Sequence, residues 1–376
     1  MRTPFEYGGS ISGPHFVNRT RELDLLQRNF AASQNTVLIS PRRWGKSSLV
    51  NRALSLAQER QRNLRVVQLD MLPIRTESQF LAAYLQATLR ALGGTGERAM
   101  SFVRESASVL LPKLTFSAGT DASFRVGFDW RQDPQDREAI LQLPERLAAR
   151  HELRVVVAID EFQGVAEIED ASNFDATLRT NWQHHRRVGY CLYGSQRHMM
   201  IGLFGSYGAP FYHFADTHVL DKISREHWVS YIVDRFTRFG KSISSEVAEM
   251  LATFVDDHSH YVQQIAQIAF GLTDKRCTAE IARTAQEQLV FQVEPFFSQQ
   301  ISRLSRTQLG FLRALLAGHQ AFSSKPVLDE FGLGSSANAS KLKRVMQERE
   351  LVQLNREGRF EFVDPVFATW LGGRLG

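Results

Sequence analysis

The chain has 376 residues, of which 43% are hydrophobic and 23% charged, values typical of folded globular proteins. They exclude a disordered, collagen-like or fibrous chain, and the length predicts two or three domains. The 45 basic and 40 acidic residues give a mild net charge of +5.

Cysteine usage and the N-terminus predict a cytoplasmic protein with no membrane partner. The two cysteines, Cys191 and Cys277, are too few for a disulfide framework, and neither lies in a C-x-x-C or His-rich cluster typical of zinc sites. The N-terminal segment lacks the apolar core of a signal peptide. No stretch reaches the ~18 uncharged apolar residues that cross a bilayer.

Along the chain, helical and strand patterns alternate. Residues 1–15, which contain glycine, proline and serine without a period, predict a loose leader. Strands are predicted at 36–40, 64–72, 154–160 and 188–195, and helices at about 16–30, 47–61, 77–92, 136–150 and 174–187. Because the strands read as continuous apolar runs between helices, they predict a parallel sheet covered on both faces. Residues 93–135 are less regular and predict an insertion or peripheral ribbon, with a helix to Leu111 and then a segment that alternates like a β-hairpin. Residues 221–290 read as helical with no convincing strand.

A candidate phosphate-binding loop lies between the first strand and the helix that follows it. Its residues are Ser40-Pro41-Arg42-Arg43-Trp44-Gly45-Lys46-Ser47-Ser48, which match G-x-x-x-x-G-K-(S/T) except that Ser40 replaces the first glycine. Such a loop points backbone N–H groups at phosphates, while Lys46 supplies positive charge and Ser47 a hydroxyl for Mg²⁺. A chance G-K-S at a helix start is the alternative, but the strand and helix on either side favour phosphate binding.

Two further strand ends carry candidate catalytic residues. The most apolar strand ends in Asp160-Glu161, where the aspartate can hold the water shell of Mg²⁺ and the glutamate can accept a proton from water. Alone, this pair is more often a solvated strand end, but its position about 115 residues after the phosphate loop favours catalysis. Ser195 ends the next strand and is a candidate sensor of the γ-phosphate, with a plain turn as the alternative.

Five segments resemble a known family in their order and spacing. They are FVNRTRELDLL, SPRRWGKSSLV, VVVAIDEFQ, YGSQRHMM and PFYHFADTHVLDKIS, within about residues 14–290. They are similar to the archaeal-type P-loop ATPases, which also occur in bacteria and belong to the AAA+/STAND group. The resemblance implies an ATP-binding core, a helical lid and a nucleotide-gated switch. It assigns Mg²⁺ binding to Asp160, water activation to Glu161 and the first sensor to Ser195.

The resemblance also implies contacts around the nucleotide. The stretch that begins with Phe16 and Val17 resembles the segment that packs near the adenine, and Ser40 departs from the family pattern because a side chain stands where only hydrogen is usual. Candidate arginine fingers are Arg179, Arg186, Arg187 and Arg197, with surface ion pairs as the alternative. A finger acting in trans requires a homo-oligomer. At the start of a lid helix, His258 or His260 either contacts phosphate or caps the helix.

The last 76 residues read as three helices, a two-stranded ribbon and a final helix, which is the order of a winged helix. They carry eleven basic and seven acidic side chains, so +4 of the net charge lies here. The exposed face of the third helix is predicted to hold Ser335, Ser336, Asn338, Ser340, Lys341, Lys343 and Arg344, with Arg356 and Arg359 on the wing. This face suits double-stranded DNA, and a protein partner is the alternative.

The sequence therefore predicts an α/β P-loop NTPase with a parallel sheet and helices on both faces, followed by a helical lid and a winged-helix domain. We expect a leader at 1–15, an ATPase core at 16–220, the lid at 221–300 and the winged helix at 301–376. The leading hypothesis is a Mg²⁺-ATP-dependent switch that hydrolyses ATP slowly or with partner stimulation. The alternative is a DNA-binding regulator in which ATP is mainly a structural or conformational ligand.

Overall fold

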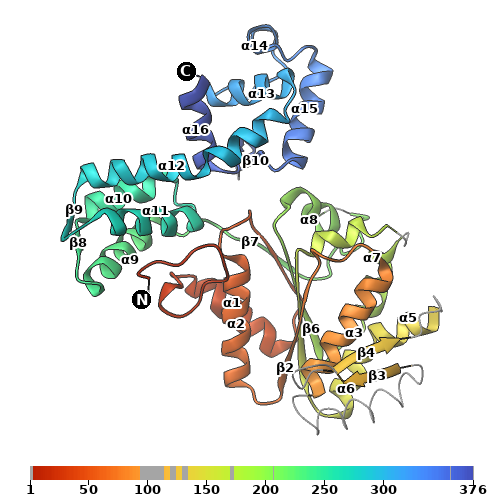
Figure 1. Ribbon diagram of the computed structural model, residues 1–376. Helices are drawn as coiled ribbons and strands as arrows, with labels where there is room; N and C mark the ends of the chain where they lie inside the picture. The colour runs from red at the N-terminus through yellow and green to blue at the C-terminus, as the bar shows by residue number, and fades with distance from the viewer. Residues whose placement is uncertain are drawn as a thin grey trace. The chain divides into compact units, whose positions relative to one another are not determined.

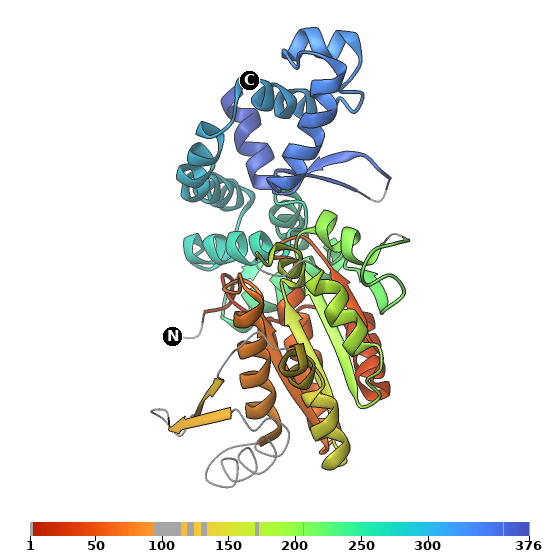
Figure 2. The same ribbon diagram turned by 90° about the vertical axis from the view of Figure 1, so that its right-hand side faces the viewer.

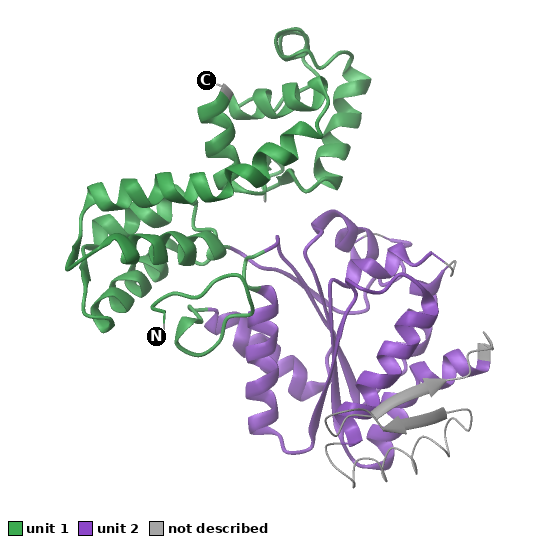
Figure 3. Ribbon diagram, viewed as in Figure 1, with its two compact units in different colours: residues 1–18, 43–45, 222–376 green, residues 19–42, 46–221 purple. Residues whose placement is uncertain are grey.

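The computed structural model describes residues 3–93, 114–118, 124–128, 134–169, 173–205, 207–355 and 357–375. The chain forms two compact units, coloured separately in Figure 3. The sheet unit contains residues 19–42 and 46–221. The helical unit contains residues 1–18, 43–45 and 222–376.

A five-stranded parallel sheet lies at the centre of the sheet unit (Figure 1). Its order is β2-β5-β6-β1-β7, with β1 at Thr36–Ile39, β2 at Leu64–Asp70, β5 at Arg154–Asp160, β6 at Val188–Gly194 and β7 at Asp216–Val219. The side chains of β1 and β6 are all buried, as are most of those of β5, because these inner strands are covered on both faces. The edge strands β2 and β7 expose part of their side chains.

Helices cover both faces of this sheet. Helices α1 (Thr20–Ala32) and α2 (Lys46–Arg60) lie on one face, and α3 (Glu77–Gly93) and α7 (Phe174–Trp182) on the other, the side nearer the viewer in Figure 2. The remaining elements of the unit are β3 (Leu114–Ala118), β4 (Phe124–Phe128), α5 (Pro134–Leu141), α6 (Leu143–Arg150), η2 (Phe162–Glu167) and α8 (Arg197–Phe204). Strand β3 pairs antiparallel with β4, which confirms the predicted hairpin, and the predicted α/β architecture is confirmed. The helix predicted to end at Leu111 lies outside the described residues.

Two predicted helices of this unit were wrong in detail, and one strand was not predicted. The helix expected at 136–150 is divided at Gln142, because Pro144 lies in the first turn of α6 and cannot continue a preceding helix. The helix expected to reach residue 187 ends at Trp182. Strand β7 was not predicted, since its exposed polar residues form no apolar run.

The helical unit begins with four longer helices: α9 (Arg225–Arg238), α10 (Ser245–Phe254), α11 (Ser259–Leu272) and α12 (Ala279–Ser302). The two-residue strands β8 (Ser242–Ile243) and β9 (Arg276–Cys277) pair with each other in parallel. The expectation of no strand in 221–290 was therefore wrong. Such short strands leave no apolar pattern in a sequence. The leader expected to be loose packs on these helices through Phe5, whose side chain is only 2% exposed.

The tail contains the predicted order of elements. They are α13 (Arg306–Leu316), α14 (Lys325–Phe331), α15 (Ser336–Glu348), β10 (Val352–Leu354), β11 (Phe360–Phe362) and α16 (Pro365–Leu375). A reciprocal capping box between Ser305 and Gln308 begins α13. The winged-helix assignment and the four-part domain division stay predictions. No helix in the described part of the chain is long and apolar enough to cross a membrane.

Candidate active site

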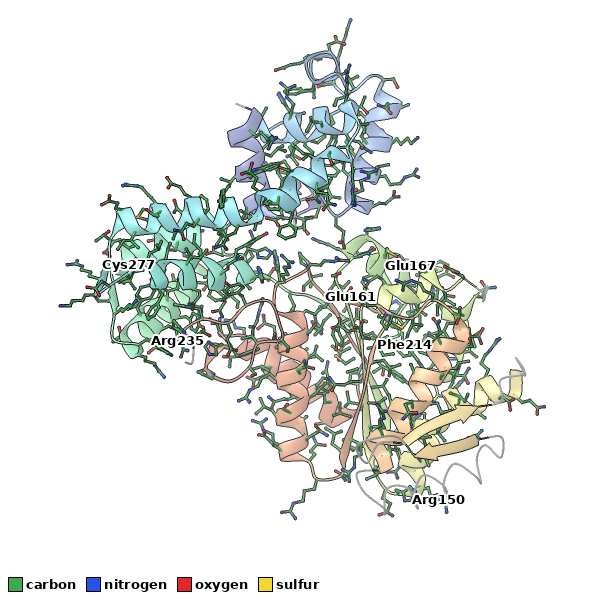
Figure 4. The ribbon with its side chains drawn as sticks, viewed as in Figure 1. Arg150, Glu161, Glu167, Phe214, Arg235 and Cys277 are labelled. Carbon is green, nitrogen blue, oxygen red and sulfur yellow. The ribbon has the colours of Figure 1, made fainter. Side chains whose placement is uncertain are left out.

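The candidate catalytic residues follow three neighbouring strands. Strand β6 pairs with β1 on one side and with β5 on the other, so the carboxyl ends of all three strands meet at one edge of the sheet. Lys46 and Ser47 begin α2 after the loop that follows β1. Glu161 follows β5 and is labelled at this end of the sheet in Figure 4, and Ser195 follows β6. The topology therefore brings together three motifs that are far apart in the sequence.

The serine that replaces the first glycine of the phosphate loop is fully buried. The backbone N–H of Ser40 donates to the Gly194 carbonyl at 3.3 Å, and the Ser40 hydroxyl donates to the Pro41 carbonyl at 3.2 Å. Its side chain is therefore bonded to the backbone of its own loop. Gly45 has a φ of +88°, a conformation that glycine adopts without strain.

The side chains of the first two motifs form one polar network. The Ser47 hydroxyl donates to Asp160 Oδ2 at 2.7 Å. The Lys46 ammonium lies 3.3 Å from Glu161 Oε1 and 3.7 Å from Asp160 Oδ1, and the lysine is only 6% exposed. One buried cation therefore faces two carboxylates.

The third motif joins this network through Glu161. Its Oε2 atom accepts hydrogen bonds from the Ser195 hydroxyl at 2.8 Å and from the Ser195 backbone N–H at 3.1 Å. The Gln163 side-chain amide donates to the same oxygen at 2.5 Å. The carboxylate of Glu161 is thus fixed by donors from two elements, which leaves Oε1 facing Lys46.

The two carboxyl groups differ in their affinity for protons. Burial raises the pKa of Asp160 and outweighs the opposing effects of Lys46 and the Ser47 hydrogen bond. Burial acts in the same direction on Glu161, but there Lys46 and the hydrogen bonds from Gln163 and Ser195 outweigh it, so the pKa of Glu161 is lowered. Glu161 is therefore held as a carboxylate, the form that accepts a proton.

The donor set beside the phosphate loop fits Mg²⁺. This ion prefers oxygen ligands and keeps several of its waters, so it needs few protein groups. The Ser47 hydroxyl and Asp160 Oδ2 already lie in contact at the start of α2. In the part of the chain that the structure describes, no group of three or more His, Cys, Asp or Glu side chains is placed to hold a metal ion. An ion here would rely on Ser47, Asp160 and phosphate oxygens.

The residues at the tip of the loop belong to the helical unit. Arg43 hydrogen-bonds Tyr261 of α11, and the Tyr261 hydroxyl donates to Asp364 Oδ2 at 2.6 Å. The Trp44 ring lies 5.7 Å from the Lys222 ammonium. The loop residues 43–44 thus contact Lys222 and Tyr261, two side chains that are distant in sequence and belong to the predicted lid.

Histidines lie at the start of α11, as expected, but His258 does not cap the helix through its side chain. Burial, with His260, Arg43 and Lys222 nearby, lowers the pKa of His258 to about 3. Burial and Arg43 lower the pKa of His260 to about 4. Both rings are therefore neutral at physiological pH, and a phosphate contact by either stays a prediction.

Other predicted site residues have varied surroundings. Pro41 and Ser48 are buried, while Arg42 is exposed. Val17 packs in the core of the helical unit, and Phe16 beside it is half-buried. Among the candidate fingers, Arg179 lies 5.1 Å from the Phe214 ring, Arg186 and Arg187 are exposed, and Arg197 begins α8. An action in trans by any of them stays a prediction.

The predicted DNA-facing surface of α15 needs two corrections. The Lys343 ammonium lies over the rings of Phe322 and Phe360, at 5.7 and 5.9 Å, and the residue is half-buried. The Asn338 amide donates to the Leu333 carbonyl at 2.7 Å and is also half-buried. The side chains that remain exposed on the helix are Ser335, Ser336, Ser340, Lys341 and Arg344, with Arg359 on the ribbon. Arg356 lies outside the described residues.

Two residues near Glu161 were not predicted from the sequence. Gln163 bonds to the Glu161 carboxylate, and Gly194 lies directly against the Gln163 side chain. The sequence does place both residues close to candidate site residues, because Gln163 follows Glu161 by two positions and Gly194 precedes Ser195. This spacing alone does not show that they contact each other, because the contact depends on the pairing of β5 with β6.

The sheet, the loop and the helix that follows it define an α/β P-loop NTPase fold with a helical C-terminal region. The chain is similar to a Walker-type ATPase of Pyrococcus abyssi, with 15% identity, a TM-score of 0.66, and coverage of 98% of this chain and 99% of that one. It is also similar to the ADP form of the ORC2 protein of Aeropyrum pernix, with 12% identity, a TM-score of 0.57, and coverage of 98% and 97%. At these identities the likeness shows the fold. Neither a scan against protein-family models nor a search of curated proteins found a match.

Proposed function

We propose that this chain is a Mg²⁺-ATP-dependent ATPase of the AAA+/STAND type, slow or partner-stimulated, that couples its nucleotide state to a winged-helix domain. The observation that carries the proposal is the single hydrogen-bonded network of Lys46, Ser47, Asp160, Glu161 and Ser195. The fold supports it, as do the ATPase and the ADP-bound protein among the similar structures. A cytoplasmic location and a homo-oligomer or protein partner are part of the same proposal.

Each side chain has a role in hydrolysis. Lys46 and the loop amides bind the phosphates of ATP, and Ser47 and Asp160 hold Mg²⁺, which when bound neutralises charge on the phosphate oxygens. The Glu161 carboxylate accepts a proton from the attacking water. At the same time the water oxygen bonds to the γ-phosphorus, and the bond between this phosphorus and the ADP oxygen breaks. Ser195 contacts Glu161 and reports the state of the γ-phosphate.

We infer that ATP activates Glu161 through Lys46, whose ammonium lies against Oε1 of the glutamate in this structure. The phosphates of ATP carry more negative charge than one carboxylate, so they attract Lys46. This movement frees Oε1 for water while Oε2 stays bonded to Ser195 and Gln163.

Two substitutions test the assignment. Lys46→Ala is expected to abolish ATP binding, because it removes the phosphate-binding cation. Glu161→Gln is expected to bind ATP normally and to lose at least 100-fold in turnover, since an amide does not accept the proton. Arg52→Ala, on the exposed side of the same helix as Lys46, is the matched control. Wild-type turnover in both site variants would overturn the proposal.

A second candidate function is a DNA-binding regulator in which ATP mainly fixes a conformation. It is favoured by the exposed serines, Lys341 and Arg344 on α15, together with the charge of +4 over the last 76 residues. Hydroxyl and basic side chains on one helix face suit phosphate contacts first and base contacts second. A protein partner on the same face is the competing outcome.

A further inference from the structure

We propose that Gln163 is a positioning residue that holds the catalytic carboxylate of Glu161, and that Gly194 provides the space for it. This inference rests on the proposed ATPase function, because it assigns a step of the same reaction. It adds two residues that do not belong to the phosphate loop or to the pair of acidic residues.

The hydrogen bonds of Glu161 define the role. Gln163 donates to Oε2 at 2.5 Å from η2, and Ser195 donates to the same oxygen through its hydroxyl and its backbone N–H. Donors on two sides of one oxygen prevent rotation of the carboxylate. Oε1 is then held on the side of the group that faces Lys46.

The orientation of the Gln163 amide follows from charge. Its nitrogen faces the carboxylate, whereas the reversed orientation would place two oxygens against each other. The other end of the group, Oε1 of Gln163, is buried and has no hydrogen-bond partner among the described residues. The residue is only 4% exposed, so this oxygen is an unfavourable feature of the fold. A side chain kept only for packing would avoid such an oxygen, which indicates that the bond to Glu161 is the reason for the glutamine.

Gly194 makes this orientation accessible. A Cβ atom at this position would lie 2.1 Å from Gln163 Oε1 and 2.7 Å from the Met200 sulfur. The glycine has no positive φ, so its requirement is spatial and not conformational. Any side chain here would displace the Gln163 amide from Glu161 or force Met200 to move.

The backbone of Glu161 also needs external support. The residue has a φ of 49°, in the left-handed region that a glutamate occupies at an energetic cost. Gln163 lies two positions further along the chain and bonds to the carboxylate of this residue.

The test compares variants that separate hydrogen bonding from packing. Gln163→Met fills a similar volume without a donor, and it is expected to lower kcat for ATP hydrolysis at least tenfold with KM within twofold of wild type. A packing role would leave kcat at the wild-type value in this variant and so would overturn the inference. Gln196→Met, beside Ser195 and half-buried, controls for a methionine near the site.

The substitution Gly194→Ala tests the space that the Gln163 side chain needs to reach Glu161. It is expected to lower kcat like Gln163→Met. With Met200→Ala in the background to remove the second clash, Gly194→Ala combined with Gln163→Ala is expected to lose no more than Gln163→Ala alone, because neither clashing side chain remains. Additive losses would contradict the assigned role of Gly194.

A crystal structure of nucleotide-free Gln163→Met supplies a readout that does not depend on activity. The Glu161 carboxylate is expected to adopt a second rotamer, and an unchanged single rotamer would sink the inference. If wild type hydrolyses ATP and Glu161→Gln does not, but Gln163→Met matches wild type, only the inference fails. If wild type shows no hydrolysis, the proposed function fails, and the crystal structure still tests the role of Gln163.

Discussion

Glu161 combines a strained backbone with a highly ordered side chain. Its N–H donates to Asp160 Oδ1 at 2.9 Å, and its carbonyl accepts from the Gly164 N–H at 2.9 Å. These bonds stabilise the left-handed turn between β5 and η2. Strain of this kind persists where neighbouring contacts determine the conformation, and here they orient the residue proposed to activate water.

A second buried network lies at the opposite end of β6. The Tyr190 hydroxyl bonds to Tyr84 at 3.2 Å and to His185 Nδ1 at 2.8 Å, and His185 Nε2 lies 3.0 Å from Gln142 Oε1. Trp182 stacks on Tyr190 with ring centroids 4.2 Å apart. With these partners, the neutral imidazole donates to Gln142 and accepts from Tyr190.

This network predicts an acid-sensitive stability. Burial is the main cause that lowers the pKa of His185 to about 4, against the opposing effect of Glu145. In the unfolded chain the ring binds a proton near pH 6.5, so stability is complete above that pH and falls as the pH drops from about 6.5 to 4. In urea titrations, wild type is expected to lose about 2 kcal/mol more than His185→Gln between pH 7 and pH 5.

Glutamine is the informative replacement for His185 because it retains a donor and an acceptor without titrating in this range. His198→Gln, which changes an exposed ring, controls for the loss of a histidine. Equal pH dependence of wild type and His185→Gln would show that the ring does not contribute to acid sensitivity.

At the scale of elements, α13 and α14 pack closely at a glycine. A Cβ on Gly310 would lie 2.1 Å from the Phe331 carbonyl oxygen, which is a backbone atom and moves only with its helix. Gly310→Ala is therefore expected to lower the free energy of unfolding by about 1–3 kcal/mol, as overpacked positions do. The measurement is chemical denaturation followed by circular dichroism.

Gly372→Ala is the control, because a Cβ there meets no atom of the described residues within 4 Å and the residue is exposed on α16. This variant is expected to raise stability by about 0.5–1 kcal/mol, since alanine loses less backbone freedom than glycine in a helix. If the Gly310→Ala variant is as stable as wild type or more stable, α13 and α14 move apart at this position without a loss in the free energy of unfolding.

Elements were predicted correctly where the local residue pattern reflects burial. The prediction from sequence failed where contacts between elements determine the role of a residue or the position of a strand. The runs TVLI and RVVVAID were assigned as strands because buried parallel strands are apolar throughout, whereas the polar edge strand β7 carries no such signal. Asp160 and Glu161 were proposed because their residue types at a strand end suit the chemistry. Gln163 was not, since its role exists only through its hydrogen bond to Glu161. Lys343 was placed on the exposed face because helical periodicity does not show that Phe360 of the ribbon lies beneath it.

At the scale of the whole molecule, the net charge of +5 is unevenly distributed. The last 76 residues carry +4, so the first 300 carry only +1. With Lys343 half-buried, the exposed positive charge of α15 consists of Lys341 and Arg344. The Arg344 guanidinium lies 3.5 Å from Glu348, but both groups are exposed, so this ion pair is weak and gives way to a phosphate.

These two side chains provide a test that separates the candidate functions. If α15 contacts duplex DNA, Lys341→Ala with Arg344→Ala is expected to reduce the slope of log affinity against log salt by about 2, since each lost phosphate contact removes about 0.9. Arg28→Ala with Arg52→Ala removes the same charge from exposed positions in the sheet unit and is expected to leave the slope unchanged. Affinity is measured by fluorescence anisotropy at several salt concentrations, with and without ATP.

A slope that falls equally in both double variants would indicate nonspecific attraction of DNA by the net charge of the protein. If wild type does not retain DNA at low salt, a protein partner is favoured. A slope change confined to the α15 variant, with ATP turnover unaltered, would show that the tail binds DNA independently of the hydrolytic residues.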